Sequence, residues 1–200
     1  MGYILPTEYT QYGLAPDITD DWITMASALM DSYCRRVSLL ATQYVERLRL
    51  TADAQSVRLS YLPLAALTAV RVRYGRPRRG ERADPFREQI AWAFSLPGSW
   101  STLDITTVDL NQPSGELIFP ENFLGLNYNE VEITYTAGLT TIPPAVKIAC
   151  AQIVRNAQAM PSTNVKLSRM DTLQMEYFSG GLIDPQVQAL LRPYIAQRIG

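Results

Sequence analysis

The chain has 200 residues, of which 47% are hydrophobic and 18% charged, and its 18 Lys and Arg against 19 Asp and Glu leave a formal net charge of −1. This balance excludes an intrinsically disordered chain and favours one folded domain, residues 1–200, with a core of its own. Histidine is absent, which excludes Ser-His-Asp and Cys-His catalysis and most zinc sites. We therefore predict no enzyme, no cofactor and no metal site.

The sequence predicts neither a membrane span nor a signal peptide, and its two cysteines are expected to be free. No apolar run approaches the roughly 18 residues of a membrane span, and Met1–Tyr12 lacks the basic start and apolar centre of a signal peptide. We expect a soluble protein with no membrane contact. Cys34 and Cys150 fall in predicted helices and are expected to be two buried thiols rather than a disulfide.

The chain begins with a tyrosine-rich N-terminal arm, Tyr3–Tyr12, which is either a frayed end or a strap that becomes ordered on assembly. A helix over residues 17–36 follows, with Asp17 or Thr19 as its cap. Asp20 and Asp21 suit the positive end of its dipole better than a cation site. The apolar positions recur at three and four residues and are Trp22, Met25, Ala26, Leu29 and Tyr33.

Residues 44–137 form a β-rich insertion, because the hydrophobic period changes there from three or four to two. Residues 44–50 and 57–61 are predicted to pair as a hairpin across a polar turn. In the next strand, residues 67–74, Val70 and Val72 face one way while Arg71 and Arg73 face the other. Further strands are expected at residues 103–108, 116–119 and 131–135.

A long excursion over residues 75–100 interrupts these strands. Residues 71–88 hold seven arginines against three acids, a local charge of +4. Arg76, Arg78, Arg79 and Arg82 could touch DNA phosphates in a channel, or could simply be a solvated loop. Trp92, Phe94 and Trp100 are expected to pin the excursion to the body or to contact a neighbouring subunit, rather than to stack on bases.

Two carboxylates on the last strand could suggest acid–base chemistry. Glu130 and Glu132 share one face about 7 Å apart, which is within the range that glycosidases use. The alternation with Val131, Ile133 and Tyr135 favours a simpler interpretation, in which the acids lie on the wet side of a half-buried strand.

Helical periodicity returns after Gly138. Tyr135, Gly138 and Pro143 are predicted to form the structural junction at which the sheet leads into a helix over residues 143–160. A β-hairpin is expected over Val165–Phe178, and a last helix over residues 184–199 begins at an Asp-Pro cap. The stripe of that helix could belong to the core or anchor a partner or a neighbouring subunit, and it consists of Leu190, Leu191, Tyr194 and Ile195.

This order of elements resembles the head-tail connector, or adaptor, family of tailed bacteriophages. Three short segments carry the resemblance, namely Val131–Gly138, Ile142–Lys147 with its Ile-Pro start, and Leu190–Tyr194, which reads Leu-Leu-Arg-Pro-Tyr. The excursion over residues 75–100 departs from the common length of the family. Contacts inferred from shorter relatives do not carry over to it.

The resemblance implies an α+β fold, in which a core of three main helices holds an inserted antiparallel sheet and ends with a β-hairpin and a helix. It also implies a non-catalytic subunit of a homo-oligomeric ring, commonly twelvefold. Such a ring binds the portal protein and a head-closure or tail-completion protein in the neck of a virion assembled in the host cytoplasm. Genomic DNA passes through its bore without sequence specificity. The alternative is a small nucleic-acid-binding module that uses Arg71–Arg87.

Overall fold

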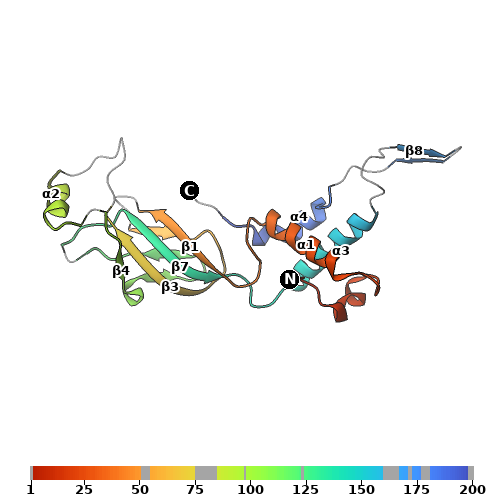
Figure 1. Cartoon of the computed structure of the whole chain (residues 1–200), viewed down its shortest axis with the longest axis horizontal. Coiled ribbons are helices and arrows are strands. Elements are labelled where there is room, and N and C mark those ends of the chain that lie inside the picture. Colours follow the sequence, from red (N-terminus) through yellow and green to blue (C-terminus); the bar gives the residue numbers. More distant parts are fainter. Residues whose placement is uncertain are drawn as a thin grey trace. The chain divides into compact units, whose positions relative to one another are not determined.

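A helical unit and a β-rich unit divide the chain. The computed structural model describes residues 2–50, 55–74, 85–96, 98–122, 124–159, 167–170, 173–176 and 181–197. The helical unit consists of Met1–Leu39 and Thr141–Ile195, and the β-rich unit of Leu40–Thr140 and Ala196–Gly200 (Figure 1). No helix of the described residues is long and apolar enough to cross a membrane.

Three α-helices form the described part of the helical unit. α1 (Asp20–Tyr33) and α4 (Pro185–Leu191) both pack against α3 (Pro144–Ala159). α3 supplies much of the core with the buried side chains Val146, Ala149, Cys150, Ala151, Ile153 and Val154. The predicted helix over residues 143–160 is confirmed, with observed bounds Pro144–Ala159. A two-stranded antiparallel hairpin, β8 (Leu167–Met170) and β9 (Leu173–Glu176), lies between α3 and α4 in the sequence, as predicted.

Two helix predictions need correction. The first helix ends at Tyr33, not at residue 36, because Arg35 adopts a left-handed conformation (φ 56°). The last α-helix ends at Leu191, because Pro193 has no N–H to donate to the preceding turn. The chain continues as the 3₁₀ turn η4 (Arg192–Tyr194) and is extended at Ile195, so the helix does not reach residue 199.

The N-terminal arm is packed in the helical unit. It forms the 3₁₀ turns η1 (Pro6–Glu8) and η2 (Thr10–Tyr12), and Tyr3 and Tyr9 are buried. The Tyr3 hydroxyl donates to the Asp31 carboxylate and accepts from the Leu39 amide at 2.8 Å. The Tyr9 hydroxyl donates to Asp20 Oδ1 at 2.6 Å. The arm is thus packed against its own chain, which differs from the predicted frayed end.

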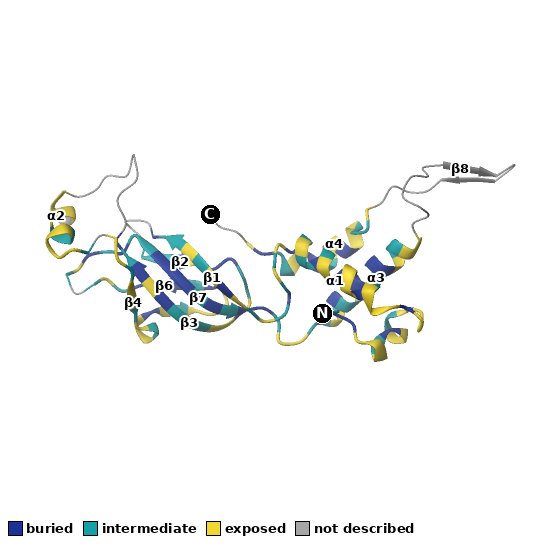
Figure 2. Ribbon diagram, viewed as in Figure 1, coloured by how far each residue is buried: buried dark blue, intermediate teal, exposed yellow. Residues whose placement is uncertain are grey.

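Two antiparallel sheets enclose the core of the β-rich unit. The first has the order β1 (Thr42–Arg49), β7 (Glu130–Ala137), β3 (Leu64–Arg73) and β4 (Ser101–Leu103). The second has the order β2 (Ser56–Arg58), β6 (Glu116–Ile118) and β5 (Asp109–Asn111). Buried side chains of both sheets form one hydrophobic cluster, and buried positions dominate β7 (Figure 2). The predicted α+β class is confirmed.

The predicted hairpin of residues 44–50 and 57–61 is wrong. β1 pairs with β7, and β2 pairs with β6 in the other sheet. Long-range pairing is favoured because β7 carries more buried residues than any other strand whose burial is described, and it pairs with β1 and β3 on its two edges. The predicted strand of residues 103–108 is also wrong. The Asp104 carboxylate accepts the Thr106 amide at 3.0 Å and starts the 3₁₀ turn η3 (Ile105–Thr107) instead.

The excursion contains a helix, α2 (Pro85–Ala93), which begins at a proline. Ile90, Ala91 and Leu96 pack against the core of the β-rich unit. Trp92 and Phe94, which were expected to make this contact, are 52% and 56% exposed. Trp92 points away from the side chains of Ile90 and Ala91, because residues that are one or two positions apart on a helix point in different directions. Phe94 lies one residue beyond the end of α2.

Candidate functional site

Four arginines and two glutamates alternate across the outer face of the four-stranded sheet. In the register of β1, β7 and β3, Glu132 lies between Arg47 and Arg71, and Glu130 lies between Arg49 and Arg73. Because side chains alternate along a strand, these six point away from the core that Val131, Ile133 and Tyr135 fill. We call these six residues, together with Trp100, the arginine face.

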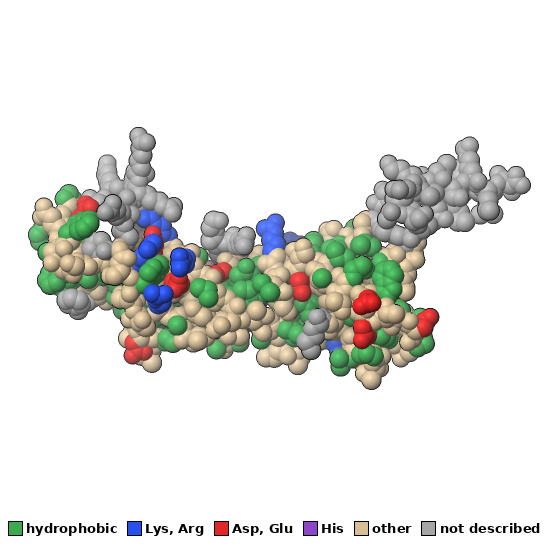
Figure 3. Space-filling model, in the orientation of Figure 1, with side chains coloured by type: hydrophobic (Ala, Val, Ile, Leu, Met, Phe, Trp, Pro, Cys, Tyr) green, Lys and Arg blue, Asp and Glu red, His purple; other side chains and the backbone are tan. Residues whose placement is uncertain are grey.

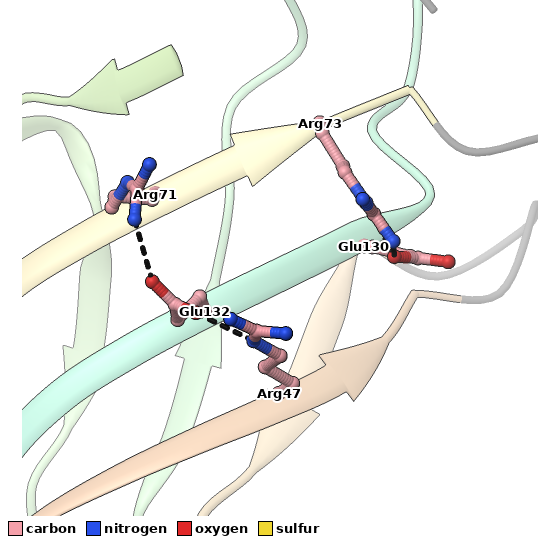
Figure 4. A network of polar contacts seen from close by, with 5 residues as sticks. All are labelled: Arg47, Arg71, Arg73, Glu130 and Glu132. Carbon is pink, nitrogen blue, oxygen red and sulfur yellow. Dashed lines mark hydrogen bonds and ion pairs between the residues drawn. The ribbon is translucent and has the colours of Figure 1, made fainter. Parts of the chain in front are cut away.

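Ion pairs join the side chains of the arginine face across the strands (Figure 4). Glu132 accepts from Arg47 Nε at 2.6 Å and from Arg71 Nη1 at 3.0 Å. Glu130 accepts from Arg73 Nε at 2.6 Å, and the Arg49 Nε lies 3.8 Å from its other oxygen. Each carboxylate is therefore held from both sides.

Trp100 adds an aromatic ring to this face. It directly precedes β4, which pairs with β3, and its ring centroid lies 4.6 Å from the Arg73 guanidinium carbon. The guanidinium carbons of Arg47 and Arg71 lie 5.7 and 5.8 Å from the same centroid. These distances permit cation–π attraction. Of the three aromatic residues predicted to pin the excursion, Trp100 lies against arginines of the sheet.

The two glutamates of the arginine face form ion pairs with its arginines. Glu132 is only 8% exposed, and the hydrogen bonds and charges of Arg47 and Arg71 hold the pKa of its carboxyl below the usual value. A general acid in a glycosidase needs a raised pKa. Glu130 and Glu132 thus form ion pairs rather than an acid–base pair. They lie on the solvent side of the strand, as predicted, and arginines flank them on both neighbouring strands.

The predicted DNA-contact residues, Arg76, Arg78, Arg79 and Arg82, lie outside the described residues. Asp17, Asp20 and Asp21 are exposed around the start of α1, and Asp20 accepts a hydrogen bond from Tyr9. Within the described part of the chain, no three Cys, Asp or Glu side chains are grouped as metal ligands would be.

The residues predicted at the sheet-to-helix junction have well-defined places. Tyr135 is fully buried, and both its burial and the nearby Glu46 carboxylate raise the pKa of its hydroxyl. Gly138 has φ 128°, and its amide donates to the Pro63 carbonyl at 3.0 Å. The Pro143 carbonyl accepts the amides of Val146 and Lys147, so it begins the hydrogen bonding of α3.

Of the C-terminal stripe, Leu191 belongs to the core of the helical unit, where it is fully buried. Leu190, Tyr194 and Ile195 are half-buried. The Tyr194 carbonyl also accepts Arg36 Nε at 2.7 Å, which ties the end of the stripe to the segment after α1.

Comparison with solved structures bears on the whole chain. A chain in the neck of an empty GTA (gene transfer agent) particle, computed with C6 symmetry, aligns with a TM-score of 0.51 over 99% of this chain and 92% of that chain. The two chains share a fold. Their sequences are 14% identical, so the similarity to the neck chain concerns the fold alone.

A chain in the neck of a native GTA particle, computed with C12 symmetry, aligns over 90% of this chain and 82% of that chain, with 14% identity and a TM-score of 0.48. No family model and no curated protein sequence matches this chain.

Proposed function

We propose that this chain is a non-catalytic subunit of the neck of a phage-like particle. The observation that carries the proposal is the fold shared with a GTA neck chain, because the alignment includes nearly all of both chains. It therefore takes in the helical unit and the β-rich unit alike. The resemblance of the sequence to head-tail connectors supports the same role from different data, since it rests on short motifs rather than on the fold.

The subunit forms a homo-oligomeric ring, twelvefold by the family resemblance, that joins the portal of the particle to a head-closure or tail-completion protein. DNA passes through the bore of this ring. A heterologous contact, in which different surfaces of neighbouring copies meet, closes into such a ring when its rotation fits. Leu190, Tyr194 and Ile195 are half-buried on the chain and serve as candidate contacts for the portal or a neighbouring copy.

Electron microscopy of the purified chain mixed with its cognate portal tests this role. We expect rings stacked on the portal, and a monomer or small oligomer without it. A Leu190→Ser variant should weaken stacking while the far-ultraviolet circular dichroism stays unchanged. Leu191→Ser, at a fully buried position, should instead unfold the helical unit. A chain that stays monomeric with every portal preparation would argue against the neck role.

The rival role, a nucleic-acid-binding module that uses Arg71–Arg87, makes a different prediction. Such a module would hold DNA tightly as a monomer, with a steep dependence on salt. The ion pairs of Arg71 with Glu132 and of Arg73 with Glu130 weaken this alternative, because they already compensate two of its arginines. Tight DNA binding by the isolated monomer, without assembly on the portal, would favour the rival.

A further inference from the structure

The arginine face carries more positive charge than its own acids compensate. Among the described residues of this face, four guanidiniums surround two carboxylates, so the arginine face itself carries a net charge of +2. In the space-filling view, arginine side chains gather around acidic ones on the β-rich unit (Figure 3). The Arg47 and Arg71 side chains are 72% and 47% exposed, so this excess charge reaches the solvent.

We propose that the arginine face contacts the phosphate backbone of DNA, and that Glu130 and Glu132 weaken this contact so that DNA can slide across it. The inference deepens the proposed function and rests on it for the passage of DNA. It assigns the contact to arginines on β1 and β3, and it assigns an attenuating role to the acids on β7.

Guanidinium groups on a regular lattice suit a phosphate chain. Each has five N–H donors, and Glu132 accepts from one nitrogen each of Arg47 and Arg71. Residues two apart on a strand are about 7 Å apart, so the arginines form two rows at regular spacing. Contacts of this kind carry no sequence information, which agrees with DNA that passes through a channel.

An extended polyanion fits this part of the chain better than a single acidic side chain would. The four guanidiniums lie in two rows, one on each strand that flanks β7, so one acidic side chain can reach only one or two of them, whereas a chain of phosphates can contact several in succession. An acidic protein segment is the competing partner, and the experiment below distinguishes it.

The two carboxylates are placed to limit the affinity. Glu132 is nearly buried and is held by arginines on both sides, so it cannot swing away when a phosphate approaches. Every phosphate that approaches Arg47 or Arg71 is therefore repelled by a fixed negative charge and competes with an existing ion pair. The contact that remains is weak and strongly screened by salt, as sliding requires.

Fluorescence anisotropy of a labelled 20-base-pair duplex, titrated with the isolated full-length chain over a series of KCl concentrations, tests this proposal. Two uncompensated charges predict a slope of log K against log [KCl] of about −2, and four predict about −4. We therefore expect Glu130→Gln with Glu132→Gln to steepen the slope by about 2 and to tighten binding at least about tenfold at 0.1 M KCl. Arg47→Gln with Arg71→Gln should abolish measurable binding.

Matched variants separate the face from the net charge. Asp109→Asn with Glu121→Gln changes the net charge by the same amount at exposed positions outside the arginine face, and should leave the slope unchanged. Arg58→Gln, on β2 of the other sheet, is the control for the arginine variants. If Glu132→Gln impairs folding, Glu130→Gln alone should still steepen the slope by about 1.

Three results would overturn the proposal. The first is no binding by the wild type at low salt, and the second is an equal gain from both pairs of acid variants. The third is that polyglutamate displaces the labelled duplex more strongly than unlabelled DNA does, which would assign the face to an acidic protein partner. Assembly on the portal is measured separately by microscopy, so these results leave the neck role standing, and loss of assembly leaves the DNA contact measurable.

Discussion

Replacing Gly138 with alanine should destabilise the β-rich unit by about 2–4 kcal/mol. Gly138 has φ 128°, which side-chain-bearing residues rarely adopt. An added Cβ would lie 2.5 Å from the Leu40 carbonyl oxygen, 2.7 Å from its carbon and 2.9 Å from the Ala41 nitrogen. All three are backbone atoms, so no side chain can rotate away to make room.

The magnitude follows from two costs. Forcing alanine into this backbone conformation costs about 1–3 kcal/mol. Moving Leu40 aside also strains the hydrogen bond from the Ala41 amide to the Leu139 carbonyl, now 3.0 Å long, and losing such a bond costs about 1 kcal/mol. Urea denaturation, followed by circular dichroism and tryptophan fluorescence, measures the sum as a shift of the unfolding midpoint.

Gly98→Ala is the matched control. Gly98 also has a positive φ, 97°, but nothing lies within 4 Å of an added Cβ, so only the backbone cost applies. The difference between the two variants therefore isolates the clash with Leu40. If Gly138→Ala lowers the stability no more than Gly98→Ala does, the clash is not real and the reasoning about this close approach fails.

Three further predictions concern side chains in both units. Arg47 lowers the pKa of Glu132, so their ion pair stabilises the fold above the ordinary carboxyl pKa, and this stabilisation is lost as the pH falls through the pKa of Glu132 in the folded protein. Glu132→Gln should therefore reduce the loss of folding stability between neutral and acidic pH, measured by urea denaturation at several pH values. Tyr3→Phe removes the hydrogen bond from the buried Tyr3 hydroxyl to the half-buried Asp31 carboxylate, which keeps the Leu39 amide as a donor at 3.1 Å. The variant should cost about 1–3 kcal/mol, measured as the same urea midpoint shift. Cys34 and Cys150 are buried, and burial raises the pKa of each thiol to about 11, so both should resist a thiol reagent until urea unfolds the chain; rapid labelling of the native protein would contradict this.

The sequence predicted which residues lie in strands better than it predicted how those strands pair. Alternation identified the dry and basic sides of β3, because that pattern is local and depends only on the pleat. Pairing depends on contacts between distant residues, and no local signal distinguishes β7 from β2 as the neighbour of β1. A short polar turn therefore suggested a hairpin that does not form.

Helix α1 shows a related limit. Large apolar residues such as Trp22 and Met25 suggested the buried stripe, but Ile23, Ala26, Ser27 and Met30 are the buried residues. The N-terminal arm explains part of this shift, because the Tyr3 amide donates to Ser27 Oγ at 3.0 Å and covers that face of the helix. Periodicity alone cannot indicate which of two overlapping stripes another segment will cover.

The arginine face was only half visible in the sequence. Arg71 and Arg73 on one strand, and Glu130 and Glu132 on another, were each recognised as an outward-facing pair. The third pair, Arg47 and Arg49, has the same spacing of two residues, but it was not predicted to face outward. Matching these three pairs as cross-strand neighbours would have predicted the ion-pair network without any structure, because opposite charges on adjacent strands favour one register.

The segments at the two ends of the β-rich insertion run side by side, since Leu40 and Leu139 form a parallel bridge. Strands paired in this way are about 5 Å apart, a gap that one or two residues can span. The insertion therefore leaves and rejoins the rest of the chain at nearly the same point. A short loop could therefore replace the insertion with little movement of the flanking residues, and a single deletion would remove both sheets together.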